Sequence, residues 1–182
     1  VQPMRFLQQL QRADVARARR RWVREQGLLD PAHLVFIDET AVTTNMVRLN
    51  GWSPRGQRLI GDVPMGHWET VTLIAGFRPT GIVAPMLIKG AMNGEAFLAY
   101  IKQCLAPTLQ RGDIVVADNV SFHKVLGVEE AIQARRANLR YLPQYSPELN
   151  PIEEVFHPLK AWLRKAAERT IKGLERRVGS FI

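Results

Sequence analysis

Two patterns of apolar positions alternate along this chain. Short runs rich in β-forming residues predict five strands, over residues 34–37, 69–77, 81–88, 113–117 and 139–142. Apolar residues that recur every three or four positions predict helices over residues 94–109 and 151–167. We expect two further helices, an Arg-rich one over residues 8–26 that Gly27 ends, and one over residues 125–136. The order β-β-β-α-β-α-β-α after the first helix indicates an α/β fold, in which helices flank one mixed sheet.

The composition restricts the class of protein. The 182 residues suit one domain, and a hydrophobic share of 46% is ordinary for a globular protein. No apolar run approaches the roughly 18 residues that a membrane helix needs, and the first residues lack the apolar core of a secretory signal. The single cysteine, Cys104, excludes an internal disulfide framework and a cysteine zinc cluster. We therefore expect a reducing, cytoplasmic setting and no membrane partner.

The net charge of +8 is spread unevenly. Residues 1–30 carry seven Arg and three acidic residues, and residues 155–182 carry seven Lys or Arg and two Glu. We expect residues 1–30 to form an Arg-rich helical linker or arm, residues 31–170 the main folded domain, and residues 171–182 a basic, weakly patterned tail. Basic ends suit a polyanion such as DNA, although solvated helix faces would explain the same charges.

Three carboxylates stand at positions where they can act together. Asp38 and Asp118 each follow a buried apolar run directly, and ligands gather at the carboxyl ends of parallel strands. Glu153 falls about one turn into the last predicted helix, which can bring it to the same edge. Clustered carboxylates repel one another unless a cation is present, and their oxygens suit Mg²⁺ or Mn²⁺. Two such ions about 3.5–4 Å apart support phosphodiester chemistry.

Each carboxylate also has a purely structural interpretation. An Asp at the end of a strand is often a turn or helix-cap residue. If Asn150 caps the last helix and Pro151 is its first residue, Glu153 occupies the reciprocal position of a capping box. These spacings alone leave both interpretations open.

Whole strings of residues are more specific than these single positions. Residues 36–40 (FIDET) resemble the first-aspartate motif of DDE transposases, and Asp118-Asn119 followed by His123-Lys124 resembles their second motif. Residues 142–153 (LPQYSPELNPIE) resemble the third motif, and residues 51–57 (GWSPRGQ) resemble the loop after the first aspartate. The most similar group is the bacterial insertion-sequence transposases related to mariner elements, and the resemblance covers roughly residues 33–163.

The resemblance carries specific implications. It implies a ribonuclease H-like fold, two divalent cations (Mg²⁺ or Mn²⁺) held by Asp38, Asp118 and Glu153, cleavage at transposon ends, and strand transfer into target DNA by a 3′-hydroxyl. It also implies a homodimer and a nucleoid-associated setting in a bacterium. Family members carry helix-turn-helix modules before this domain, and only about 30 residues precede the first predicted strand here. We therefore expect any such DNA-binding part to be encoded separately.

Neighbours of the three carboxylates are candidates for supporting roles. Asn119 is a candidate to orient water or phosphate, or is a turn residue bound to its own backbone. His123 is a candidate to contact DNA phosphate or the metal shell. Strand alternation points Glu39 away from Asp38. On a helix, Glu154 is rotated about 100° from Glu153, so only one of the two is expected to bind metal, and the motif favours Glu153.

Basic and aromatic residues suggest contacts with DNA. Arg55, Arg58 and Lys124 are candidates for phosphate contacts, although solvated surface charge is the simpler explanation for any one of them. Trp52 is a candidate to stack on a base or on a partner subunit, or to pack within its own loop.

Two other functions use the same pattern of residues. A domesticated or inactive remnant would act only as a DNA-binding module, and the intact carboxylate triad argues against it. A ribonuclease acting on RNA–DNA hybrids would share the fold and the metals, and the third motif disfavours it. The leading prediction is a metal-dependent DNA transposase.

Overall fold

The computed structural model describes residues 12–48 and 50–182, so residues 8–11 of the first predicted helix lie outside the described part. The described chain forms a five-stranded sheet with strand order β3-β2-β1-β4-β5. The strands are β1 (Leu34–Thr43), β2 (Thr70–Arg78), β3 (Gly81–Lys89), β4 (Ile114–Ala117) and β5 (Asn138–Tyr141). The helices are α2 (Ala13–Gln26), α3 (Gly94–Tyr100), α4 (Val128–Gln133), α5 (Glu153–Ala166) and α6 (Ile171–Phe181). This confirms the predicted element order and the mixed α/β class.

The sheet is mixed because its two halves are connected differently. A tight turn joins β2 to β3, and the two strands pair antiparallel, because Pro79 and Gly81 favour a turn between them. β1 is antiparallel to β2 and parallel to β4, and β4 is parallel to β5. Parallel neighbours require crossover connections, which α3 and α4 provide.

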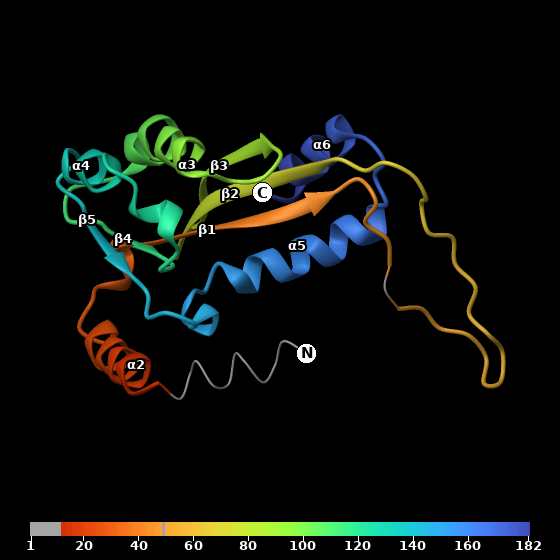
Figure 1. Cartoon of the computed structure of the whole chain (residues 1–182), viewed down its shortest axis with the longest axis horizontal. Coiled ribbons are helices and arrows are strands. Elements are labelled where there is room, and N and C mark those ends of the chain that lie inside the picture. Colours follow the sequence, from red (N-terminus) through yellow and green to blue (C-terminus); the bar gives the residue numbers. More distant parts are fainter. Residues whose placement is uncertain (1–11, 49) are drawn as a thin grey trace.

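Helices cover both faces of this sheet, so its central strands are buried on both sides (Figure 1). On one face, α3 and α4 pack their apolar side chains against Val35, Ile37 and Val115. On the other, α5 and α6 pack against Val42, Val71 and Leu73. Inward residues of β1 alternate between these two cores, which the two-residue period of a strand requires.

Two helices are shorter than the sequence predicts. The helix over residues 94–109 begins as α3, widens into a π-helical segment over Ile101–Leu105, and ends as a 3₁₀ turn over Ala106–Thr108. Pro107 lies at the start of that turn, and its missing N–H cannot continue an α-helix. The helix predicted from residue 125 begins at Val128, because Gly127 before it adopts a left-handed φ of 95°.

The carboxyl-terminal segment differs from the tail expected over residues 171–182. Residues Ile171–Phe181 form α6, whose Leu174 and Val178 are buried against α5. The ring of Phe181 lies 5.7 Å from that of Trp162 on α5. Ile171, Leu174, Val178 and Phe181 recur every three or four residues and form the apolar face that packs on α5, so this segment is a docked helix and not a weakly patterned tail.

Thr170 offers a test of α6. Its side chain accepts a hydrogen bond of 3.1 Å from the backbone N–H of Gly173 and thereby caps the helix. We expect Thr170→Ala to lower the free energy of unfolding by about 1 kcal/mol. Ser180→Ala, at an exposed position near the end of the same helix, should change it by less than about 0.5 kcal/mol. Urea unfolding of both variants measures the difference, and equal effects would contradict the assigned cap.

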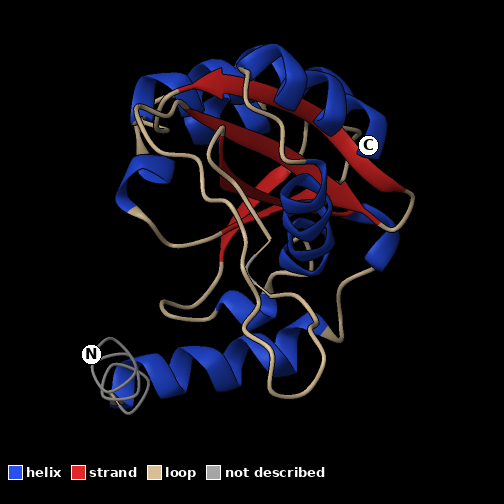
Figure 2. Ribbon diagram, turned by 90° about the vertical axis from the view of Figure 1, so that its right-hand side faces the viewer, coloured by secondary structure: helices blue, strands red, loops and turns tan. Residues whose placement is uncertain are grey.

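The arm before the sheet is a docked helix. α2 buries Val15 and Trp22, and Trp22 packs in a small core with Val116 and Leu142. Its arginines are mostly exposed. In Figure 2, α2 lies beneath the sheet and the helices that cover it. The predicted Arg-rich helix is therefore present, and Trp22 anchors it beside Leu142, the residue that follows β5.

A long loop joins β1 to β2 and reaches away from the sheet and helices (Figure 1). Within this loop, residues 53–57 form a turn, in which Gln57 N–H donates to the carbonyl of Pro54 over 3.0 Å. The loop exposes several large apolar side chains, among them Trp52, Ile60 and Met65. No described helix has the length and apolar character needed to span a membrane.

Candidate active site

A pocket opens where the parallel strands β1 and β4 stop pairing. Three carboxylates line it: Asp38 from β1, Asp118 directly after β4, and Glu153 at the start of α5. The segment between β5 and α5 forms much of its wall, through residues Leu142 to Pro147 and Asn150. Segments more than a hundred residues apart therefore converge on one opening.

The sheet register places the two aspartates. β1 and β4 are neighbouring parallel strands, as the sequence analysis required, and their last paired residues are Ile37 and Ala117. Asp38 and Asp118 each follow that pair directly. β1 itself continues to Thr43 because it keeps pairing with β2, so Asp38 lies within a strand rather than at its end.

Asp38 is enclosed by donors and by other acids. Its Oδ1 accepts the backbone N–H of Glu39 over 2.8 Å, and its Oδ2 accepts the side-chain amide of Asn150 over 3.2 Å. Burial, followed by the negative charges of Glu39, Asp118 and Glu153, raises the pKa of Asp38 to about 8. The negative charges of Asp118 and Glu153 therefore repel an ionised Asp38, and a cation in the pocket would relieve this repulsion.

Asp118 is held by a buried histidine. His123 is 0% exposed; its Nδ1 lies 2.5 Å from Asp118 Oδ1, and its Nε2 lies 3.2 Å from Glu39 Oε2. Burial would lower the pKa of this ring, but the contacts with Asp118 and Glu39 outweigh it and raise the pKa to about 9. A protonated ring donates from Nε2 to the Glu39 carboxylate and from Nδ1 to the backbone carbonyl of Asp118 over 3.3 Å, and its charge pairs with the Asp118 carboxylate.

Packing fixes the position of that histidine. The ring of Phe97 lies 4.1 Å from the ring of His123 at an interplanar angle of 30°. His123 is thus enclosed away from the surface, which removes a direct contact with DNA phosphate. It remains a candidate for the shell around a metal, acting through Asp118.

Two asparagines present unpaired carbonyl oxygens. The side-chain oxygens Oδ1 of Asn119 and Asn150 are buried and have no hydrogen-bond partner among the described residues. Both residues line the pocket. A buried amide oxygen without a partner is costly, and a water or a cation would satisfy it.

The capping-box interpretation of Glu153 is wrong. α5 begins at Glu153 itself, after Ile152, and no side chain caps this end. Asn150 instead turns into the pocket, where its amide donates to Asp38. Glu154 lines a neighbouring hollow but not this pocket, whereas Glu153 lines both.

The remaining candidates from the sequence lie away from the pocket lining. Lys124 is exposed, and its ammonium lies 5.3 Å from the ring centroid of Tyr141. Trp52, Arg55 and Arg58 are exposed on the β1–β2 loop, and Trp52 is 97% exposed. The structure does not bring these four residues to the carboxylates.

The donor set suits a hard divalent cation, although its side chains do not converge on one point. No group of three or more His, Cys, Asp or Glu side chains within the described ranges is close enough to hold a metal ion as the side chains stand. Asp38 and Asp118 are each held by a neighbouring donor, Asn150 and His123 respectively. Oxygen ligands, mutual repulsion and unpaired amide oxygens in one pocket nevertheless fit Mg²⁺ or Mn²⁺.

Three supporting residues, Glu39, Asn150 and Arg19, carry no local signal of their contacts in the sequence. Strand alternation points Glu39 away from Asp38, and the structure agrees. Glu39 supports the site indirectly, because it contacts His123, which in turn contacts Asp118. The sequence suggests a helix cap for Asn150, which instead donates to Asp38, and Arg19 is one of several arginines on α2 but donates to Ser146 in the wall of the pocket. These contacts of Glu39, Asn150 and Arg19 each join residues more than 80 positions apart, so no local pattern could reveal them.

Comparison with known proteins identifies the family. Residues 33–175 match the family model described as DDE superfamily endonuclease. No curated protein matches the chain in sequence.

Solved structures share the fold. A pre-cleavage Mos1 transpososome matches with a TM-score of 0.72 and 16% identity, covering 92% of this chain and 53% of that chain. The Mos1 strand transfer complex gives 0.70 and 16%, covering 92% and 52%. The catalytic domain of Mos1 mariner transposase gives 0.66 and 13%, covering 92% and 78%. The chain thus spans about half the length of the longer Mos1 chains and shares their ribonuclease H-like fold.

The family match spans every strand of the sheet and the helix that carries Glu153, and the fold agrees with it independently. This chain belongs to the DDE superfamily endonuclease family.

Proposed function

We propose that this chain is the catalytic domain of a DNA transposase that cleaves phosphodiester bonds at transposon ends and transfers the freed strand. Asp38, Asp118 and Glu153 are the proposed catalytic residues and would hold two divalent cations, Mg²⁺ or Mn²⁺. The observation that carries the proposal is that these three acids, from three separate segments, line one pocket. The Mos1 relatives include a paired end complex with Mg and one with Mn, which supports this choice of metal.

The residues around the three carboxylates have separate roles in the proposed reaction. When bound, the metals would supply Lewis-acid activation of the attacking oxygen and charge stabilisation of the leaving one. Asn150 orients Asp38, and protonated His123 orients Asp118. The side-chain oxygen of Asn119 can accept a hydrogen bond from a water in the pocket, including one that is bound to a phosphate group. The 3′-hydroxyl left by cleavage is the nucleophile for strand transfer, with target DNA as the second substrate.

DNA is the proposed partner, in the form of transposon ends and target. Basic residues on α2 and α6 provide exposed positive charge, and Lys124, Arg55 and Arg58 are exposed where DNA can reach them. We also propose a homodimer, for which the exposed apolar side chains of the β1–β2 loop, including Trp52, supply a surface. A nucleoid-associated place in a bacterial cytoplasm stays a prediction from the resemblance to insertion-sequence transposases.

The test is cleavage of defined nucleic acids by the purified chain. We expect nicking of supercoiled DNA in Mn²⁺ or Mg²⁺ and none after the metal is removed with EDTA. Preference for an RNA–DNA hybrid over duplex DNA would instead identify a ribonuclease. Binding of DNA without cleavage in either metal would identify a DNA-binding remnant and would count against the proposal.

A further inference from the structure

One arginine of α2 contacts the wall of the pocket. α2 ends before the segment that matches the family model, which begins at residue 33. Nevertheless Arg19 Nη1 donates to Ser146 Oγ over 2.7 Å and to the carbonyl of Tyr145 over 3.3 Å. Its Nη2 forms an ion pair with Glu148. We call residues 143–150, which join β5 to α5, the pocket loop.

These contacts are specific to the guanidinium group. Its planar fork reaches a hydroxyl, a carbonyl and a carboxylate at once, which a lysine ammonium on a flexible stem cannot reproduce with the same geometry. Ser146 is buried, and the Arg19 side chain is only 29% exposed. One turn further along α2, Trp22 is buried against Leu142, the residue directly before the pocket loop. α2 is therefore held at two points, by Arg19 at Ser146 and by Trp22 at Leu142.

The pocket loop leads directly to the carboxylates. After Ser146, residues Pro147–Leu149 form a 3₁₀ turn, and Asn150 follows with 3% of its surface exposed. The Asn150 amide donates to Asp38, and its backbone carbonyl accepts the N–H of Glu153 over 3.2 Å. A shift of the loop would therefore displace the groups that orient two of the three acids.

The loop conformation needs support from outside. Tyr145 has a φ of 58°, in the left-handed region that residues with a Cβ seldom adopt. A backbone held in this region persists only where its surroundings stabilise it. Arg19 supplies one stabilising contact at the Tyr145 carbonyl and another at the next residue.

We infer that Arg19 is a positioning residue, which fixes the pocket loop so that Asn150 and Glu153 face Asp38. The consequence for cleavage rests on the proposed function, whereas the effect on the loop does not. Arg19 already has a carboxylate partner in Glu148, so its main role is distinct from that of the exposed arginines beside it, which are available to DNA phosphate.

The first experiment measures the loop itself. Hydrogen–deuterium exchange of the metal-free protein should show amides of residues 143–150 exchanging about ten-fold faster in Arg19→Ala, because a charge-assisted network is lost. Arg17→Ala removes an exposed arginine from the same helix and should leave this exchange unchanged. Glu148→Gln should also accelerate exchange in residues 143–150. The double variant Arg19→Ala/Glu148→Gln should exchange only slightly faster than Arg19→Ala, since the two residues act through one contact.

The second experiment measures cleavage. Arg19→Ala should lower kcat about ten-fold or more while its Kd for DNA matches that of Arg17→Ala. Unchanged exchange in Arg19→Ala, or strictly additive effects with Glu148→Gln, would overturn the inference. Weaker DNA binding with unchanged kcat would make Arg19 a DNA contact instead. If the wild-type protein does not cleave DNA, the proposed function fails, and the exchange data still decide whether Arg19 holds the loop.

Discussion

An Asp118→Asn protein is expected to keep its fold and to lose metal-dependent DNA cleavage, with kcat reduced by about a thousand-fold or more. Asparagine has nearly the same shape, so the packing around β4 is preserved. It lacks the charge that a divalent cation requires, and protonated His123 then faces a neutral amide instead of its carboxylate partner. Both changes oppose binding of a metal in the pocket.

Titration calorimetry with Mn²⁺ measures the binding, and nicking of supercoiled DNA measures the activity. Glu153→Gln and Glu154→Gln form a matched pair on adjacent positions of α5, of which only Glu153 lines the pocket with Asp38 and Asp118. Glu153→Gln should behave like Asp118→Asn, and Glu154→Gln should cleave nearly as the wild type does. Cleavage by Asp118→Asn at the wild-type rate would sink the assignment of the carboxylates.

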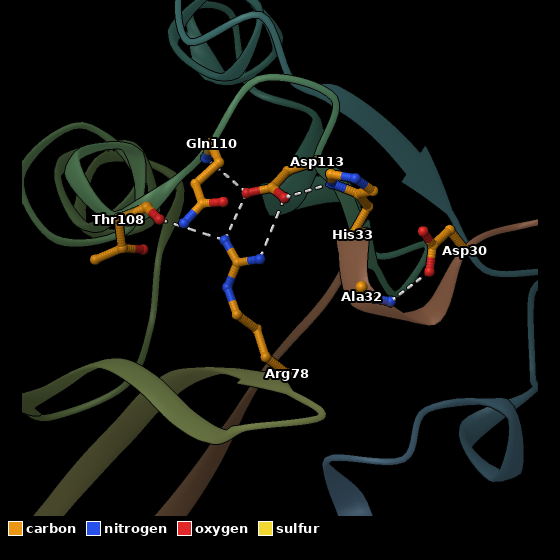
Figure 3. A network of polar contacts seen from close by, with 7 residues as sticks. All are labelled: Asp30, Ala32, His33, Arg78, Thr108, Gln110 and Asp113. Carbon is orange, nitrogen blue, oxygen red and sulfur yellow. Dashed lines mark hydrogen bonds and ion pairs between the residues drawn. The ribbon is translucent and has the colours of Figure 1, made fainter.

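The second large effect concerns stability and lies away from the pocket. Asp113, just before β4, is fully buried, and Arg78 from the end of β2 reaches it with both terminal nitrogens, at 2.5 and 3.2 Å (Figure 3). The backbone N–H of Gln110 also donates to Asp113 over 2.7 Å, and His33 Nδ1 lies 3.4 Å away. We expect Asp113→Asn to lower the free energy of unfolding by about 3–5 kcal/mol, because Arg78 would keep its charge in a largely buried place.

The pH dependence gives a second readout for the same pair. Burial would raise the pKa of Asp113, but the hydrogen bonds from Arg78 and Gln110 outweigh it and hold the pKa below its ordinary value. A depressed folded-state pKa contributes stability above the unfolded pKa of about 4, and this contribution is lost as the pH falls through the folded value. The difference between wild type and Asp113→Asn should therefore narrow below about pH 4.

Denaturant unfolding at several pH values checks both statements. Glu69→Gln is the control, since Glu69 pairs with Lys89 over 2.7 Å at an exposed site. That change should cost less than about 1 kcal/mol. A loss for Asp113→Asn no larger than for Glu69→Gln, or a difference that does not depend on pH, would show that the buried pair contributes little.

The strands and the order of elements were predictable because their signals are local. Buried β-type runs such as residues 114–117 are continuous in sequence, and the turn-forming residues between Arg78 and Gly81 favour a hairpin of the strands beside them. The motif strings likewise placed Asp38, Asp118 and Glu153 in one family pattern. The ends of elements were less predictable, since β1 continues past Asp38 only because β2 supplies a partner, and α4 begins late because of one left-handed glycine.

The sequence by itself determined the α/β class, the succession of strands and helices, and which acids were candidates. The tertiary structure decided that α2 and α6 dock on the domain, that Asn150 turns toward Asp38 rather than capping α5, and that His123 is buried against Asp118. The physical reason is range. Periodicity and turn chemistry act over a few residues, whereas each of these contacts joins groups that only the parallel pairing of β1 with β4, or the packing of helices on the sheet, brings together.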